Sequence, residues 1–290
     1  MSRKTIAFAL LAACLPHPLL AASAQGYTVS RPVEEKNVAS GKQQIDPAKG
    51  YIYFHGPARQ NILLLKTPSD EQRAAFEADW KKAFDKAKSK YPGQLKSWQA
   101  DAELAKKSEI KLGPKPVEPT EQTFSIGNIE SRMQVQIGPQ FVYAKGDSDY
   151  GYLQEVEPGT YTIYGPIFLA ANGAVAGKCF CMGTVKFEVV PGKITNLGDF
   201  MTLRWMGADE LLRARDPALA GKPPQPVNYD LPASLTAKVN QRADLRAAGK
   251  MNNFFGIMID RMPAVPGVLG YQRDKVIDLK AQTADAAPAG

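Results

Sequence analysis

A two-residue hydrophobic period in the middle of the chain constrains its fold more than any other feature. Apolar and polar residues alternate over 129–137 and again over 185–189, which indicates strands with one face in the core and one face in water. Further short strands, several of them bounded by Gly-Asp or Pro-Gly turns, are expected at 51–54, 62–65, 141–144, 152–156, 161–164 and 194–197. We therefore predict a mainly β fold, a β-sandwich, over residues 49–204.

A helical pattern interrupts this region. Ser69, with Gln72 three residues later, forms a capping-box pattern. Apolar residues follow at intervals of three and four, first as Phe76, Trp80, Phe84, Ala87 and Tyr91, and after Pro92-Gly93 as Leu95, Trp98, Ala102 and Ala105. Each series is typical of the apolar face of a helix. Because Pro-Gly usually ends a helix, we expect an antiparallel helical hairpin inserted at 69–110.

The segments on either side of the β-rich region lack its periodicity. Residues 25–48 are polar and aperiodic, so we interpret them as a flexible lead-in. Residues 205–290 are interpreted as a mixed C-terminal extension, with short helices over 208–215 and 232–248. The apolar run 254–259 favours burial, which implies that this extension packs back on the sandwich.

The N-terminus has the form of an export signal. A basic start precedes an apolar stretch, and Ala22-Ser23-Ala24 is a small-residue site suited to a signal peptidase. We expect residues 1–24 to be removed, which leaves Gln25 as the first residue of a periplasmic or otherwise exported protein. An alternative stays open, because residues 11–14 (LAAC) resemble a lipobox. Cys14 would then anchor an outer-membrane lipoprotein.

Charge and residue counts limit the function classes. The formal net charge is +7, but no basic stripe with interleaved aromatic residues is present, so nucleic-acid binding is not expected. No uninterrupted apolar run reaches the roughly 18 residues that span a bilayer, so no transmembrane span is expected. His55 is the only histidine outside the export signal, and G-x-S-x-G, H-E-x-x-H and P-loop patterns are absent. We expect no catalytic residues and no enzyme.

Cys179, Cys181 and Met182 form the most unusual cluster of the sequence. In a strand, residues 179 and 181 point to the same face, and in an oxidising compartment such a pair forms a local disulfide. Two alternatives stay open. The thiols can remain reduced and inert, or the two thiolates and the thioether of Met182 can bind copper as Cu(I), which prefers soft sulfur ligands. No other cofactor is expected.

Two Pro-Gly segments carry a family resemblance. Residues 157–163 (EPGTYTI) and 190–198 (VPGKITNLG) each run from a turn into a strand. This pattern resembles that of Gram-negative cell-envelope β-sandwich domains of unknown function, and the hairpin of transthyretin-like and carboxypeptidase-regulatory-like sandwiches. The resemblance covers residues 48–72 and 121–203. It implies a sandwich fold and an envelope location, and it carries no catalytic residues.

These features together favour an exported cell-envelope protein that acts as a non-catalytic binding or structural module. Its partner would be an envelope protein or polymer, bound through the insertion at 69–110. The alternative function is that of a soft-metal or thiol-redox protein that uses Cys179 and Cys181.

Overall fold

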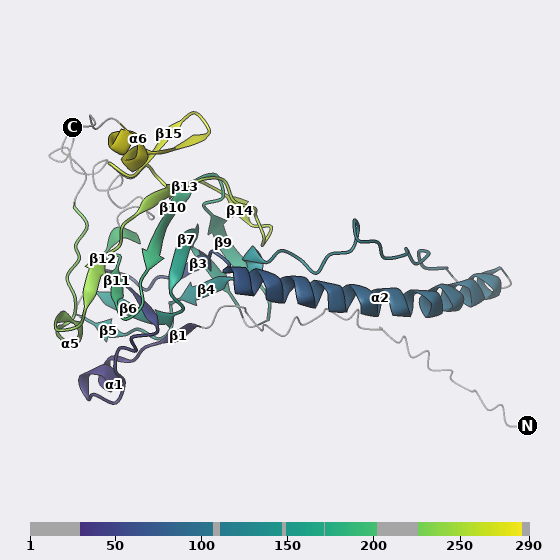
Figure 1. Cartoon of the computed structure of the whole chain (residues 1–290), viewed down its shortest axis with the longest axis horizontal. Coiled ribbons are helices and arrows are strands. Elements are labelled where there is room, and N and C mark those ends of the chain that lie inside the picture. Colours follow the sequence, from purple (N-terminus) through teal and green to yellow (C-terminus); the bar gives the residue numbers. More distant parts are fainter. Residues whose placement is uncertain (1–29, 107–110, 147–148, 171, 202–225, 286–290) are drawn as a thin grey trace, which may run out of the picture.

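Strands dominate the body of the molecule, and one long helical arm projects from it (Figure 1). The computed structural model describes residues 30–106, 111–146, 149–170, 172–201 and 226–285. Within these ranges the prediction of a mainly β fold is confirmed. The export signal, Cys14 and the helix expected over 208–215 lie outside the described residues.

Two larger sheets form the body. The six-stranded sheet has the order β1 (Ser30–Pro32), β6 (Tyr150–Val156), β2 (Gly50–Gly56), β11 (Ile194–Asn196) and β12 (Asn240–Arg242), with β5 (Ala144–Lys145) also paired to β6. The five-stranded sheet has the order β13 (Arg246–Ala248), β10 (Thr184–Val189), β7 (Gly159–Gly165), β3 (Ile62–Lys66) and β4 (Gln134–Ile137). Strand β11 runs parallel to both of its neighbours, and the other pairs in these two sheets are antiparallel.

Smaller elements surround the two larger sheets. A three-stranded sheet has the order β14 (Met258–Ile259), β9 (Val175–Cys179) and β8 (Ile167–Leu169), and β15 (Leu269–Gln272) pairs with β16 (Lys275–Asp278). The helices are α1 (Glu35–Ala39), α2 (Asp70–Ala105), α5 (Ala233–Thr236) and α6 (Leu279–Asp285), and η1 (Glu130–Arg132) is a 3-10 turn.

The central strands β2 and β3 are buried along their whole length. Ile52 of β2 and Leu64 of β3 belong to one core cluster, which draws side chains from both larger sheets. Tyr51 lies in a second cluster beside α1, and Leu63 lies in a third cluster beside β8 and β9. Because side chains alternate along a strand, each central strand is covered on both faces. This two-sided burial explains why both strands are continuous apolar runs in the sequence.

The flexible lead-in expected over 25–48 is wrong for the residues described. Strand β1 pairs with β6, so that Ser30 lies opposite Val156, and α1 follows it. Val33 and Val38 are buried in the same cluster as Tyr51. Residues 30–48 are ordered because two apolar side chains and one strand pairing close this side of the six-stranded sheet.

The helix expected over 232–248 is wrong beyond Thr236. The chain next forms β12 and β13, which pair with β11 and β10 at the edges of the two larger sheets. Leu235 is buried as expected, but Val239 is 63% exposed. Backbone pairing at open sheet edges outweighs helix propensity here. Residues 226–285 therefore complete both sheets, and a domain boundary near 204 does not describe the fold.

The arm contains one helix, so the predicted helical hairpin at 69–110 is wrong. Helix α2 is a single element of 36 residues, about 54 Å long, and Pro92 lies inside it. Its start is as predicted: the Ser69 hydroxyl accepts from the backbone N–H of Gln72, whose side chain accepts from the Ser69 N–H. Pro92 has no N–H, so the helix loses one backbone hydrogen bond at this position. The proline is exposed, and water can donate a hydrogen bond to the backbone carbonyl that is left without its helical partner.

An extended return segment, residues 111–128, runs back along α2 in place of a second helix (Figure 1). Phe124 of this segment packs against Trp80 and Phe84, with ring centroids 6.0 Å and 5.5 Å away, respectively. The indole N–H of Trp80 donates to the carbonyl of Phe124 at 3.2 Å. We call these three residues the arm seam, and the helix with its return segment the arm. The seam joins the two parts of the arm.

Two strands are shorter than the sequence indicates. The strand expected over 129–137 begins at Gln134, because η1 occupies the residues before it. The strand expected over 141–144 is reduced to β5. Phe141 has a φ of 57° and is 67% exposed, so it lies outside the sheet.

The C-terminal segment before β14 covers the outer face of the five-stranded sheet. Phe254, Phe255 and Ile257 pack against the cluster that contains Leu63, as expected for the apolar run 254–259. The last two residues of that run form β14 and are exposed. The sequence therefore predicts the docking of this segment but not the exposure of its end.

An ion pair closes this segment against β9. Asp260 Oδ2 lies 2.6 Å from the Nζ of Lys178. Burial works to raise the pKa of Asp260, but the hydrogen bonds from Lys178 and from the Arg261 backbone outweigh it, and the pKa lies below its ordinary value. Because the folded pKa is lowered, the pair stabilises the fold at neutral pH and loses this contribution as the carboxylate is protonated.

Replacing Phe124 by Ala is expected to loosen the arm and leave the body intact. The variant loses two ring contacts worth about 1–2 kcal/mol together, so amides of α2 near Phe84 should exchange with deuterium about tenfold faster. Hydrogen-exchange mass spectrometry measures this directly. Phe141→Ala removes an exposed ring of the same size and serves as control. Equal exchange in both variants would contradict the role of the arm seam.

Replacing Asp260 by Asn should destabilise the protein in a pH-dependent way. The side chain of Asp260 is 40% exposed, so solvent screening limits the expected loss at pH 7 to at most about 1 kcal/mol. Urea unfolding at a series of pH values should show this difference shrinking below about pH 4, as the wild-type carboxylate is protonated. Asp230→Asn, at an exposed position, is the control. A loss that stays constant down to pH 3 would exclude a contribution from the charge.

Candidate functional site

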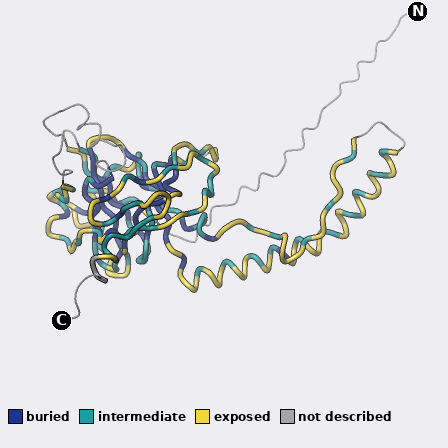
Figure 2. The backbone as a smooth tube through the Cα atoms, turned by 90° about the horizontal axis from the view of Figure 1, so that it is seen from above, coloured by how far each residue is buried: buried dark blue, intermediate teal, exposed yellow. Residues whose placement is uncertain are grey.

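Most of the surface of the arm makes no contact with the body. In Figure 2 the arm is coloured mainly as exposed, with intermediate residues along one side, whereas nearly all of the buried residues lie in the body. Phe84 is the only buried residue of α2. In the described ranges, no helix is both long and apolar enough to cross a membrane. A helix usually covers a core with its apolar stripe. Within the described residues, α2 packs against the return segment and, near its start, contacts Glu157 and Arg132 of the body, and most of its remaining surface is exposed.

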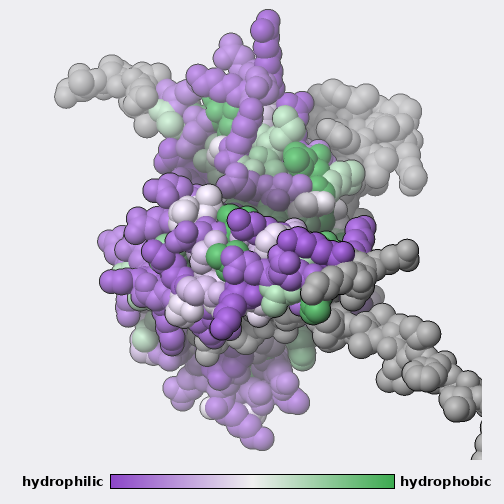
Figure 3. Space-filling model, turned by 90° about the vertical axis from the view of Figure 1, so that its right-hand side faces the viewer, coloured by the Kyte–Doolittle hydropathy of each residue, from purple (hydrophilic) through white to green (hydrophobic). Residues whose placement is uncertain are grey.

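Positive charge gathers in the middle of the arm. Residues 81–96 contain six lysines and one aspartate. Lys82, Lys86 and Lys96 are exposed and, at about 100° per residue, fall on the side of α2 opposite Trp80. Figure 3 views the molecule from the arm end and shows a mostly hydrophilic surface. We call residues 81–96 the basic middle of the arm.

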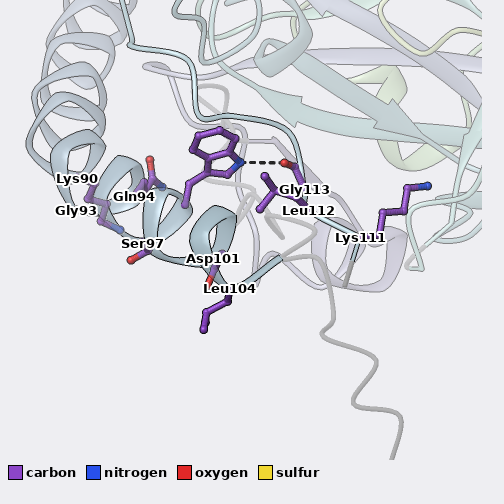
Figure 4. Close-up of a pocket in the computed structure, with 10 residues that line it drawn as sticks. Lys90, Gly93, Gln94, Ser97, Asp101, Leu104, Lys111, Leu112 and Gly113 are labelled. Atoms are coloured by element: carbon purple, nitrogen blue, oxygen red, sulfur yellow. Dashed lines mark hydrogen bonds between the residues drawn. The ribbon is translucent and has the colours of Figure 1, made fainter. Parts of the chain in front are cut away.

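A groove of about 620 Å³ lies at the tip of the arm (Figure 4). We call it the tip groove. Its polar lining comes from both parts of the arm, with Lys90, Gln94, Ser97 and Asp101 on α2 and Lys111 on the return segment. Leu104 and Leu112 add apolar surface. The volume falls within the range of about 300–1,000 Å³ that is typical of ligand sites.

Trp98 holds the two walls of the tip groove together. Its indole N–H donates to the carbonyl of Gly113 at 2.9 Å (Figure 4). Trp80 makes the same kind of bond to Phe124 nearer the body. The apolar periodicity predicts Trp98 on the inner face of a helix, but nothing in the pattern indicates that Gly113 lies against it. The wall formed by the return segment is therefore not predicted from the sequence.

Cys179 and Cys181 form the local disulfide that the sequence predicts. Their sulfur atoms are 2.08 Å apart and their Cα atoms 5.1 Å apart. Both residues are buried, Cys179 as the last residue of β9 and Cys181 in the turn that follows. Their carbonyls accept hydrogen bonds from the backbone N–H groups of Asp260 and Met251, respectively. The disulfide therefore lies beneath the C-terminal segment that covers this face.

The same bond bears on the alternative of a copper site. Sulfur atoms bonded to each other offer no thiolate to a metal, and Met182 is 40% exposed beside them. Met201, which could have supplied a further thioether, lies in the core cluster between the larger sheets. Among the described residues, no three His, Cys, Asp or Glu side chains form a metal-binding group. Copper binding stays a prediction for the reduced protein only.

His55, at the end of β2, has both ring nitrogens engaged. Its Nδ1 lies 2.7 Å from Asp149 Oδ2, and its Nε2 lies 3.1 Å from the carbonyl oxygen of Asn228. Asp199 accepts a hydrogen bond from the Asn228 N–H, and burial raises the pKa of Asp199. The ring therefore joins β2 to the segment that contains Asn228. It presents no free nitrogen to a substrate.

No protein-family model matches the chain. Neither a curated protein nor a solved structure matches it either. Among the described residues, the arm is an extended surface that the core does not use.

Proposed function

We propose that this protein is an exported, non-catalytic binding module of the cell envelope. In this proposal a β-sandwich body carries the arm, and the arm binds an acidic envelope polymer. The observation that carries the proposal is α2, a helix of 36 residues that buries only one of them. A helix that covers no core adds little to the stability of the fold, and its exposed surface is available to bind a partner.

The packing of the body supports a sandwich that acts as a rigid base. Ile52 and Leu64 come from different sheets and share one core cluster, as facing sheets of a sandwich do. The resemblance of residues 157–163 and 190–198 to envelope sandwich domains points the same way. A binding element on a rigid base loses less entropy on binding than one on a mobile chain.

The basic middle of the arm indicates the class of partner. Six lysines in 16 residues attract an acidic polymer through a diffuse field, which needs no precise geometry. The aromatic rings of Trp80 and Phe84 are taken up in the arm seam, so they are not displayed for stacking on nucleic-acid bases. An acidic envelope protein is the alternative partner.

A non-catalytic role agrees with the state of the groups most suited to chemistry. The ring of His55 is held between two oxygen acceptors. Cys179 and Cys181 are joined to each other, which removes their thiolates as nucleophiles. The described residues that remain exposed on the arm are mostly lysines, acids and amides without a neighbouring histidine or cysteine.

Reversing charge on the basic middle should weaken binding of an acidic polymer. In Lys82→Glu/Lys86→Glu/Lys96→Glu, three attractive contacts become repulsive, so the affinity for dextran sulfate should fall about tenfold or more. Isothermal titration calorimetry on the full chain at low salt measures this. Neutral dextran should not bind, and added salt should weaken the wild-type interaction.

The matched control reverses three exposed lysines of the body. Lys42→Glu/Lys186→Glu/Lys275→Glu changes the net charge by the same amount, and all three positions are exposed. We expect a loss of less than about threefold from this control, since its charges lie away from the arm. Equal losses in both variants, or no binding by the wild type, would contradict the proposal. Circular dichroism would verify that α2 remains helical.

The export part of the proposal has its own test. Protein purified from the envelope of the producing cell should begin at Gln25. It should also be lighter than the reduced chain by two hydrogen atoms, because of the disulfide. Intact-mass spectrometry before and after reduction measures both properties. A chain that begins with an acylated Cys14 would select the lipoprotein alternative, and an uncleaved chain would contradict export.

A further inference from the structure

The tip groove differs in chemistry from the basic middle of the arm. The exposed lysines Lys82, Lys86 and Lys96 of the basic middle offer charge and lie outside the groove, whereas the groove, which shares Lys90 and Gln94 with the basic middle, combines charge with neutral polar groups and apolar surface. Lys90 on α2 and Lys111 on the return segment line the groove from its two sides. The long side chain of Lys111 extends outward in Figure 4, so it would have to rotate to place its ammonium group over a bound anion. Resting on the proposed function, we propose that the tip groove binds a carboxylated sugar unit, such as a hexuronate, of an acidic envelope glycan.

The polar lining matches the groups of such a sugar. The Gln94 amide donates and accepts hydrogen bonds, the Ser97 hydroxyl does both, and the Asp101 carboxylate accepts. Sugar hydroxyls can donate to Asp101 and accept from Gln94. The ammonium groups of Lys90 and Lys111 suit the carboxylate, because hydrogen bonds between ionised partners are stronger than neutral ones.

The apolar part of the groove suits the C–H face of a sugar ring. Trp98 contributes ring surface to the lining, and the bond from its indole N–H to Gly113 fixes its orientation. Leu104 and Leu112 extend this apolar surface. A fixed aromatic ring can bind a ligand with little loss of side-chain entropy.

Asp101 favours a sugar over a chain of phosphates. Its carboxylate lies in the same groove as the two lysines, and it would repel the closely spaced charges of a polyphosphate. A uronate unit carries one charge and several hydroxyls, so it can meet both the lysines and the aspartate. The combination of cations, one carboxylate and an aromatic ring therefore selects a carboxylated sugar.

The test compares two lysines on one segment. Tetragalacturonate is titrated into the full chain by calorimetry at about 0.15 M salt, where charges beyond about 8 Å are screened. Lys111→Met should weaken binding about threefold to fivefold, and Gln94→Ala by a similar factor. Lys115→Met removes the same charge four residues further along, at an exposed position outside the groove, and should leave the affinity nearly unchanged.

Three outcomes would overturn the proposal. These are equal losses in Lys111→Met and Lys115→Met, binding of the neutral maltotetraose as tight as that of tetragalacturonate, or tighter binding of tripolyphosphate that is lost in Lys111→Met. Dextran sulfate binding, measured on the same variants, separates this proposal from the proposed function. If dextran sulfate still binds through the basic middle while Lys111→Met and Lys115→Met weaken tetragalacturonate binding equally, only the groove assignment fails.

Discussion

The burial of β2 and β3 on both faces is the constraint on which the rest of the body depends. Both faces of β2 and both faces of β3 must be covered by other apolar side chains. One face of each strand enters a shared core cluster, to which both larger sheets contribute. The other two faces need cover from elsewhere in the chain. The segment from β1 to α1 closes one outer face, and the segment before β14 closes the other. These two segments look polar or irregular in the sequence, but they are ordered because their apolar side chains cover the central strands.

The arm follows a different rule, because no core requires it. It is held together by the arm seam and by the bond from Trp98 to Gly113, so a few aromatic side chains define the path of the return segment. Trp80 and Trp98 face the same side of the helix and use their N–H groups in the same way. Most other residues of the helix are exposed, so packing does not restrict which charged side chains occupy them, and these charges can serve solubility or binding.

Sequence reasoning predicted the body better than the arm, and the reasons are physical. Alternation and turn residues predict eight of the eleven strands in the two larger sheets, and the capping box at Ser69 marks the start of α2 correctly. The predicted hairpin is wrong because Pro92-Gly93 does not end the helix, and the phase of the apolar stripe indicates this. From Tyr91 to Leu95 the spacing is four, so the apolar face continues unbroken across the proline, as a single helix requires. The pairing of β12 with β11 could not be predicted, because it depends on a sheet edge formed by distant residues.

The separation of body and arm also bears on where binding chemistry can lie. Three groups of the body make contacts within the fold: His55 joins β2 to Asn228, and Cys179 and Cys181 are bonded to each other. The side chains of the arm are mostly exposed, so replacing them leaves the packing of the core almost unchanged. In the proposed function, stability and recognition depend on different residues, and a substitution on the outer face of α2 is expected to alter binding without the loss of packing that a core substitution brings. This independence makes the arm the part of the molecule in which a binding function can be tested without unfolding the body.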